Sequence, residues 1–220
     1  CDEFLQGVTV RELPHGQERL GGQGLHPAHE IGRLALRRQD ALQGLELGFE
    51  ELHLALELVH GYSWLWLADL PLALLTGLLA WRWWPRQRMP GLLAVLFLGF
   101  AWLPLAMLLF SAQSLWLAAT GEFVLGRAPV HALTIGFSAG LLVAMVTRVT
   151  QGHSGRPLAM PAVAWFAFIL LQLVVLLRIA AELLADPVAW QAVAALLWLV
   201  ALAPWALRLL WIYLTPRADG

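Results

Sequence analysis

The sequence has no lysine and only one cysteine, Cys1, among its 220 residues. A single cysteine excludes an internal disulfide and carries no information about the redox compartment. Every basic residue is arginine, which we interpret as a bias of the coding sequence, because the Ala, Gly, Pro and Leu that such a bias favours are also abundant. The sequence contains no Ser-His-Asp set, metalloprotease motif or paired catalytic carboxylates. Soluble catalysis is therefore not indicated, and we expect no nucleic-acid partner.

Charged residues are scarce and unevenly distributed. They make up 13% of the chain, whereas 60% is hydrophobic and the mean hydropathy is +0.68, far from the values of a soluble domain. Residues 1–62 hold ten of the fifteen acidic residues and five of the seven histidines. We therefore divide the chain into a polar, acidic N-terminal piece, 1–62, and a membrane domain, 63–220.

The N-terminal piece offers few signals of function. It lacks the basic start, apolar run and small-residue cleavage site of a signal peptide. Apolar residues three and four apart over 42–59 favour an amphipathic helix, although part of this stretch also alternates. His26 and His29 flank Pro27 with no cysteine or patterned carboxylate beside them, so we assign them no metal. We assign the piece no function, and a disordered segment and an out-of-frame translation both stay open for it.

Five apolar stretches of the second piece reach or approach the roughly 20 residues that a helix needs to cross a bilayer. They are continuously apolar and do not alternate, which favours helices over barrel strands. The predicted fold class is therefore all-α, a polytopic bundle of transmembrane helices in a lipid bilayer. The predicted spans are 64–81, 91–110, 131–147, 161–184 and 188–210.

The placement of arginine predicts how these spans are oriented. Seven arginines lie in or beside the first connection, the third connection and the C-terminal end, against two at the alternate connections. Positively charged connections stay on the cytoplasmic side, so we predict that these three regions, including the C-terminus, are cytoplasmic. Tryptophans near the span ends fit the membrane interface. This orientation places His131 near the outer face and His153 near the inner face.

The third span differs from the others in its small and polar residues. Gly136, Gly140 and Ala144 recur every four residues, which we interpret as a packing surface for another helix. A second face carries a polar stripe, which we expect to face the bundle interior because polar groups are costly inside a membrane. The members of this stripe are His131, Thr134, Ser138 and Met145.

The histidines at the two ends of this span are the candidate metal ligands. His131 is the stronger candidate, since a neutral imidazole binds haem iron or copper and tolerates apolar surroundings. The alternative is that His131 only hydrogen-bonds to a neighbouring helix. The two histidines cannot bind the same metal ion if the helix is straight, because His153 lies 22 residues further on, roughly 33 Å at 1.5 Å per residue.

The stretch Gly-His-Ser-Gly-Arg-Pro at 152–157 follows this span. Its glycines permit tight turns, and Arg148 and Arg156 bring two positive charges, so the loop suits an anion such as a haem propionate or a phosphate. It lacks the spacing and the lysine of a phosphate-binding P-loop. An arginine-anchored cytoplasmic loop is an equally good interpretation of the same residues.

These motifs resemble the NnrS family of bacterial inner-membrane proteins, which contain haem and copper and act in the response to nitric oxide. The resemblance is expected to cover residues 64–220 and to be absent from residues 1–62. The matching stretches are His-Ala-Leu-Thr-Ile-Gly at 131–136, Ala-Met-Val-Thr-Arg at 144–148, Gly-His-Ser-Gly-Arg-Pro-Leu at 152–158, Trp-Leu-Ala-Asp-Leu-Pro at 66–71, Ala-Trp-Leu-Pro at 101–104 and the tail from Tyr213 to Gly220.

The resemblance implies a multi-pass inner-membrane protein that binds haem and copper. His131 and His153 are carried over as motif positions, with Arg148 and Arg156 beside them, and neither histidine is assigned to haem or to copper. Members of the family have about twice as many spans, so the chain is expected to be a C-terminal part whose missing N-terminal helices are partners. Turnover of nitric oxide, handling of metal–nitrosyl species and sensing all stay open.

Two other interpretations need no cofactor. A transporter or channel would use Asp69, Arg178 and Glu182 to line a polar path, although Arg178 and Glu182, four residues apart on one helix face, also suit a simple ion pair. The sequence shows no inverted repeat and no matched pair of broken helices to support a transporter. The other interpretation is a purely structural membrane subunit.

Overall fold

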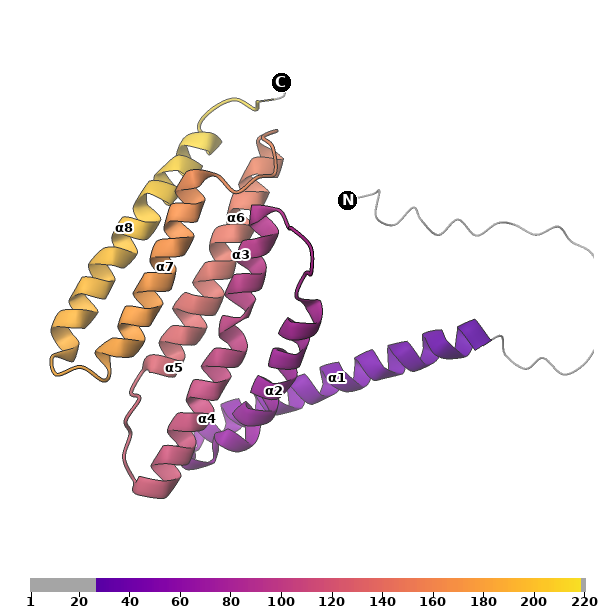
Figure 1. Ribbon diagram of the computed structural model, residues 1–220, viewed down its shortest axis with the longest axis vertical. Helices are drawn as coiled ribbons and strands as arrows, with labels where there is room; N and C mark the ends of the chain where they lie inside the picture. Colours follow the sequence, from indigo (N-terminus) through magenta and orange to yellow (C-terminus); the bar gives the residue numbers. More distant parts are fainter. Residues whose placement is uncertain (1–26, 219–220) are drawn as a thin grey trace, which may run out of the picture. The chain divides into compact units, whose positions relative to one another are not determined.

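The computed structural model describes residues 27–218, with their side chains from residue 33 onward (Figure 1). His26 and the side chain of His29 lie outside this described part. The contacts divide the chain into two units, Cys1–Leu42 and Gln43–Gly220. Helix α1 (Pro27–Leu58) crosses this division, which confirms the helix expected over residues 42–59. Its last turns therefore pack with the membrane unit, although composition grouped them with the acidic piece.

The second unit is built of helices, and the described residues contain no β-strand, so the predicted all-α class is confirmed. A 3-10 turn, Tyr62–Trp64, precedes α2, and a π-helical segment, Ala132–Ala139, joins α5 to α6. The helices are α2 (Trp66–Trp83), α3 (Gly91–Phe100), α4 (Trp102–Thr120), α5 (Ala128–His131), α6 (Gly140–His153), α7 (Ala162–Ala181) and α8 (Pro187–Tyr213).

Four stretches of the described chain are long and apolar enough to cross a membrane, one fewer than predicted. The predicted span 64–81 corresponds to α2, which falls short because Asp69, Arg82 and three tryptophans lower its mean hydropathy. The other four predictions each match a stretch, and the observed stretches are Gly91–Thr120, Ala128–His153, Ala162–Ala181 and Pro187–Tyr213.

The first of these stretches is longer than the predicted 91–110 and is interrupted at Ala101. Pro104 explains the interruption, because its ring nitrogen has no hydrogen to donate to the carbonyl of Phe100 four residues earlier. The helix resumes and ends at Gly121, whose φ of +77° is the left-handed conformation that closes many helices. The stretch therefore continues as α4 well beyond the predicted end.

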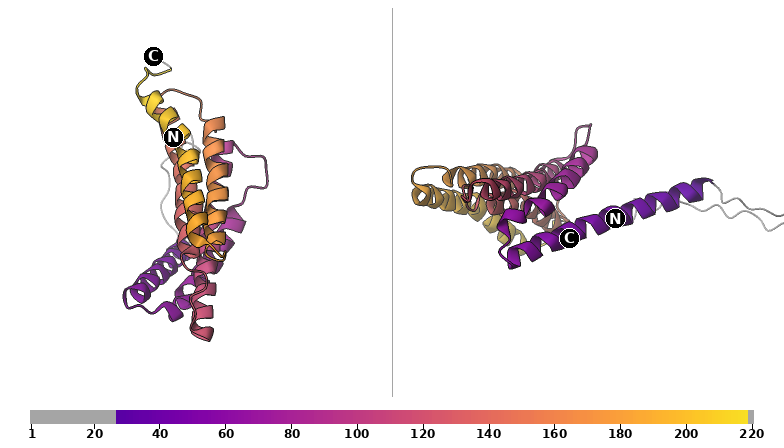
Figure 2. Two further views of the ribbon diagram at one scale, coloured as in Figure 1. Left: turned by 90° about the vertical axis from the view of Figure 1, so that its left-hand side faces the viewer. Right: turned by 90° about the horizontal axis from the view of Figure 1, so that it is seen from below.

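Helix pairs enclose two cores in the second unit. Helices α7 and α8 lie side by side along most of their length, α2 packs on α4, and α3 packs on α6 (Figures 1 and 2). One core surrounds Leu171 and Phe168 of α7, and the other surrounds Phe110 of α4. Many large apolar side chains, such as Leu196, point outward instead. An apolar exterior around small buried cores fits a bundle whose solvent is lipid.

The arginine-rich connections gather at one end of the bundle, as the alternation of spans predicts. Ala218 donates its backbone N–H to the carbonyl of Ser154 at 2.9 Å, which joins the C-terminal segment to the third connection. Gly91 ends the first connection and packs against Met160, whose Cβ would lie 2.8 Å from a Cβ added there. At the other end, Gly126 packs against the carboxylate of Glu182.

Candidate functional site

His131 lies at the junction of α5 and the π-helical segment, inside a membrane span. π-Helical turns are rare and are frequently found at functional sites. The Nε2 atom of His131 is buried and has no hydrogen-bond partner among the described residues. A buried imidazole nitrogen costs free energy when nothing binds it. Nε2 of His131 is therefore a buried imidazole nitrogen that no helix group in the described part satisfies.

Two cations belong to the surroundings of His131. Arg127 lies one helical turn before His131 and its carbonyl accepts the His131 backbone N–H at 3.0 Å, and α7, which carries Arg178, packs against α5. Arg178 also lines an open groove of about 370 Å³ with Ile135 of the π-helical segment and Trp198 of α8. The positive charge near His131 thus comes from these two arginines, not from the motif residues Arg148 and Arg156.

The small-residue stripe packs against other helices, as predicted. Gly136 lies against the indole of Trp102, and a Cβ added there would be 2.5 Å from its Cδ2 atom. The Nε1 of that indole donates to Oε1 of Gln172 at 2.6 Å, which holds the ring in place. Gly140 lies against Gly99 and Phe168. These glycines are needed for close approach between helices, and they carry no chemistry.

The expectation that the polar stripe faces the bundle interior is wrong. Thr134, Ser138 and Met145 are exposed on the described bundle. Thr134 donates to the carbonyl of Val130 at 2.7 Å, and Ser138 donates to that of Leu133 at 3.1 Å. A hydroxyl bonded to its own helix can face lipid at little cost.

His153 lies at the opposite end of the same span from His131. It is the last residue of α6, so the loop begins at Ser154, two residues later than predicted. His153 is exposed and lines an open groove of about 360 Å³ together with Met145, Arg148 and Leu158. The structure thus brings together two of the four predicted site residues, His153 and Arg148.

Arg156, the fourth predicted site residue, contacts the C-terminal segment instead. Its Nη2 donates to Oγ1 of Thr215 at 3.4 Å, and it is not among the residues that line the groove of His153. Its Nη1 is buried without a hydrogen-bond partner in the described part of the chain. The contact helps hold the end of α8 against the third connection.

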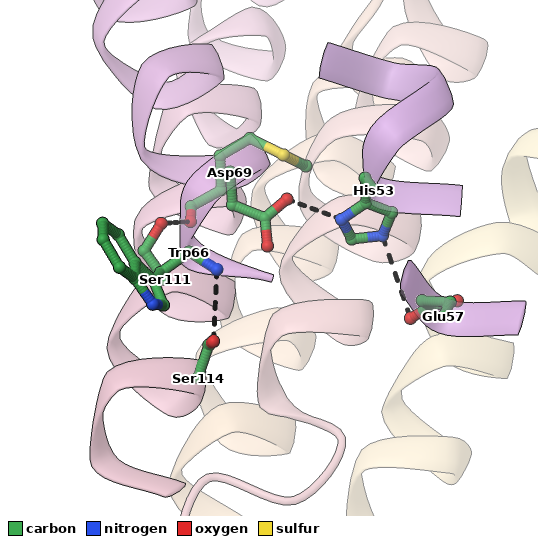
Figure 3. Close-up of polar contacts among 7 residues, drawn as sticks. His53, Glu57, Trp66, Asp69, Ser111 and Ser114 are labelled. Carbon is green, nitrogen blue, oxygen red and sulfur yellow. Dashed lines mark hydrogen bonds and ion pairs between the residues drawn. The ribbon is translucent and has the colours of Figure 1, made fainter. Parts of the chain in front are cut away.

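The sequence analysis missed a buried carboxylate–imidazole pair. Asp69 of α2 is fully buried, at 0% exposure, and its Oδ1 lies 2.5 Å from Nδ1 of His53 of α1 (Figure 3). Nε2 of the same imidazole faces Oε1 of Glu57 at 3.8 Å, and the ring meets Phe110 edge-on. The hydrogen bond to Asp69 raises the pKa of His53, although burial of the ring opposes the rise.

A cavity of about 210 Å³ adjoins this pair, and Glu57 and Phe110 both line it. Gln113 lines it too; it is 5% exposed, and its Oε1 accepts the N–H of Leu125 at 2.6 Å. That bond fixes the amide and leaves Nε2 as a buried donor without a partner among residues 33–218. Arg127 contributes a positive charge to the same wall.

Two signals in the sequence point to this pair. Asp69 is an ionisable residue inside an apolar stretch, and such residues pair or serve a function. His53 and Glu57 lie four residues apart, which places them on one helix face. Composition separated the two halves of the pair, because His53 lies in the acidic piece and Asp69 in the apolar one.

The three polar residues of the transporter interpretation do not form one group. Asp69 pairs with His53, whereas Glu182 packs against Gly126 at the end of α7. In the part of the chain that the structure describes, Arg178 and Glu182 form no ion pair. No observation therefore favours a polar path through the bundle.

The fold and the apolar spans define a multi-pass helical membrane protein. The chain matches the family model described as NnrS protein over residues 24–217, and it belongs to the NnrS family. No curated protein and no solved structure matches it. The match begins at residue 24, so the expectation that the resemblance is absent from residues 1–62 is wrong for 24–62. The short motifs that revealed the family lie in the membrane domain, whereas the acidic part of α1 offers none.

Proposed function

We propose that this chain forms a haem-binding part of a multi-pass bacterial inner-membrane protein that acts in the response to nitric oxide. The observation that supports it most directly is His131, whose buried Nε2 has no partner in the described part and lies beside a π-helical segment in a membrane span. The arginine-rich end of the bundle would face the cytoplasm together with the C-terminus. Turnover, metal handling and sensing of nitric oxide are all compatible with this proposal.

The residues present fit haem better than they fit copper. Haem iron needs one or two axial ligands from the protein, and a partnerless imidazole suits that role. Residues 33–218 contain no group of three or more His, Cys, Asp and Glu side chains that could hold a metal ion. His153 and Met145 share one groove and offer an imidazole and a thioether, which copper accepts. A copper ion there would need further ligands from outside the described part.

In this proposal the residues around His131 have separate roles. Bound haem would supply an iron centre able to coordinate small diatomic molecules. His131 would hold the iron, and Arg127 and Arg178 would neutralise the propionates. Arg148 cannot contact the same haem, because it lies 17 residues after His131 along the span, roughly 25 Å away. Arg156 cannot contact it either, since it lies further along the chain than Arg148.

Absorption spectra of the purified intact protein, oxidised and reduced, test this proposal. We expect haem bands in the wild type that are lost or shifted in His131→Ala and unchanged in His60→Ala, a histidine exposed at the end of α1. Haem loss in His131→Ala should occur without loss of helical circular dichroism. Folded wild-type protein without haem, or haem bands that ignore His131, would contradict the proposal.

A further inference from the structure

We propose that the groove beside His153 binds one anionic phospholipid, with the phosphate held by Arg148 and His153 and an acyl chain along the outer face of α6. The proposal needs only the membrane placement that the apolar spans define, so it does not depend on haem at His131. The groove, of about 360 Å³, lies at the end of the span Ala128–His153. The ends of spans lie at the depth of the lipid head groups.

The end of the bundle that holds this groove carries positive charge with no acidic residue to balance it. Residues 82–90, 148–161 and 205–218, which form or flank the arginine-rich connections, contain no Asp or Glu. In the described part of the chain, the side chains of Arg148 and His153 are exposed and form no hydrogen bond or ion pair. The counter-ion of Arg148 therefore comes from outside the described residues. Basic pockets beside membrane helices bind the head groups of anionic lipids.

The groove places two donors on either side of an apolar strip. Met145, Val149 and Gly152 lie within about 60° of one another on α6, at about 100° per residue. Arg148 and His153 flank this strip on opposite sides, about 140° apart. The guanidinium and an imidazole N–H can therefore donate to the oxygens of one phosphate that lies between them.

The same face of α6 continues as an apolar track toward the middle of the span. Leu142, Met145 and Val149 are all exposed on the described bundle. Leu142 lies ten residues before Gly152, roughly 15 Å along the helix, which is about half of a hydrocarbon core of ~30 Å. An acyl chain of one leaflet therefore fits this track while its phosphate lies at Arg148. A free phosphate ion would leave the track unused, so the apolar face favours a lipid.

Gly152 keeps the floor of the groove open. A Cβ added there would have only Cδ2 of Leu158 within 4 Å, at 3.9 Å. Its φ also lies outside the left-handed region, so the helix accepts a larger side chain at this position. Gly152→Leu would fill the groove without changing the charge of the protein.

Native mass spectrometry of the purified, delipidated intact protein tests the site, with dioleoyl phosphatidylglycerol as the titrated lipid. We expect the first phosphatidylglycerol to bind more tightly than dioleoyl phosphatidylcholine, whose choline the arginines repel. Arg148→Gln should weaken this first binding step about fivefold, the contribution of one basic residue near an anionic lipid surface. His153→Ala should weaken it as well by removing the second donor, and Gly152→Leu should weaken it by filling the groove.

Arg88→Gln is the matched control, because it removes the same charge from an exposed position at the same end of the bundle but outside the groove. It should leave the first binding step unchanged. Equal weakening by Arg148→Gln and Arg88→Gln would mean a diffuse attraction to the arginine-rich end and would overturn the proposal, as would wild-type binding by Gly152→Leu. Displacement of the lipid by an equal concentration of inorganic phosphate would assign the groove to a free anion instead. None of these results depends on the haem spectrum that tests His131.

Discussion

Replacing Gly136 by alanine should destabilise the protein by about 1–3 kcal/mol, the usual cost of overpacking a close helix contact. The added Cβ would lie 2.5 Å from Cδ2 and 2.6 Å from Cγ of Trp102. The indole cannot move aside cheaply, because its Nε1 donates to Gln172 at 2.6 Å and a shift would break that bond. Thermal unfolding followed by circular dichroism in detergent would measure the loss.

Two other glycines provide matched controls for this variant. A Cβ at Gly140 would meet its nearest atom, in Phe168, at 3.4 Å, which is an ordinary contact. A Cβ at Gly48 of α1 would meet nothing within 4 Å, so Gly48→Ala should be neutral or stabilising through its helix propensity. Equal unfolding temperatures for the Gly136→Ala and Gly140→Ala variants would show that the indole does not press on Gly136.

The parts of the fold that the sequence predicts are those that local patterns determine. Continuous apolar runs located four of the five predicted spans, and the recurrence of Gly136, Gly140 and Ala144 identified the face that packs on other helices. Each of these two patterns can be recognised from the residues of a single helix, without knowledge of its neighbours. The predicted span 64–81 has too low a mean hydropathy to count as a membrane span, because the charges and tryptophans of α2 reduce it.

The site depends on features that local patterns do not contain. The polarity of Thr134 and Ser138 predicted an inner face, but both side chains are exposed and each hydroxyl bonds to its own helix. The contact between His53 and Asp69 joins residues from two helices that composition had assigned to different pieces. His131 was found because a lone histidine in an apolar run is visible in sequence, whereas its partnerless Nε2 is visible only in three dimensions.

Replacing Leu171 by alanine should cost about 2 kcal/mol, near the lower end of the usual range of about 2–5 kcal/mol for a buried leucine. Leu171 of α7 is 0% exposed and packs in one core with Val95, Val143 and Phe168. Lipid and detergent tails are as apolar as leucine, so little of the usual transfer free energy is lost. What remains is the loss of packing around the cavity, which the rigid neighbours cannot fill.

Leu173→Ala on the same helix is the matched control, because Leu173 is 53% exposed and points away from that core. It removes the same atoms from a position that lipid or detergent contacts in both the folded and the unfolded state, so it should change the unfolding free energy by less than about 0.5 kcal/mol. Unfolding curves of both variants in one detergent would give the two values. Similar losses at positions 171 and 173 would mean that the two faces of α7 are equally packed, in conflict with a bundle whose outer surface meets lipid.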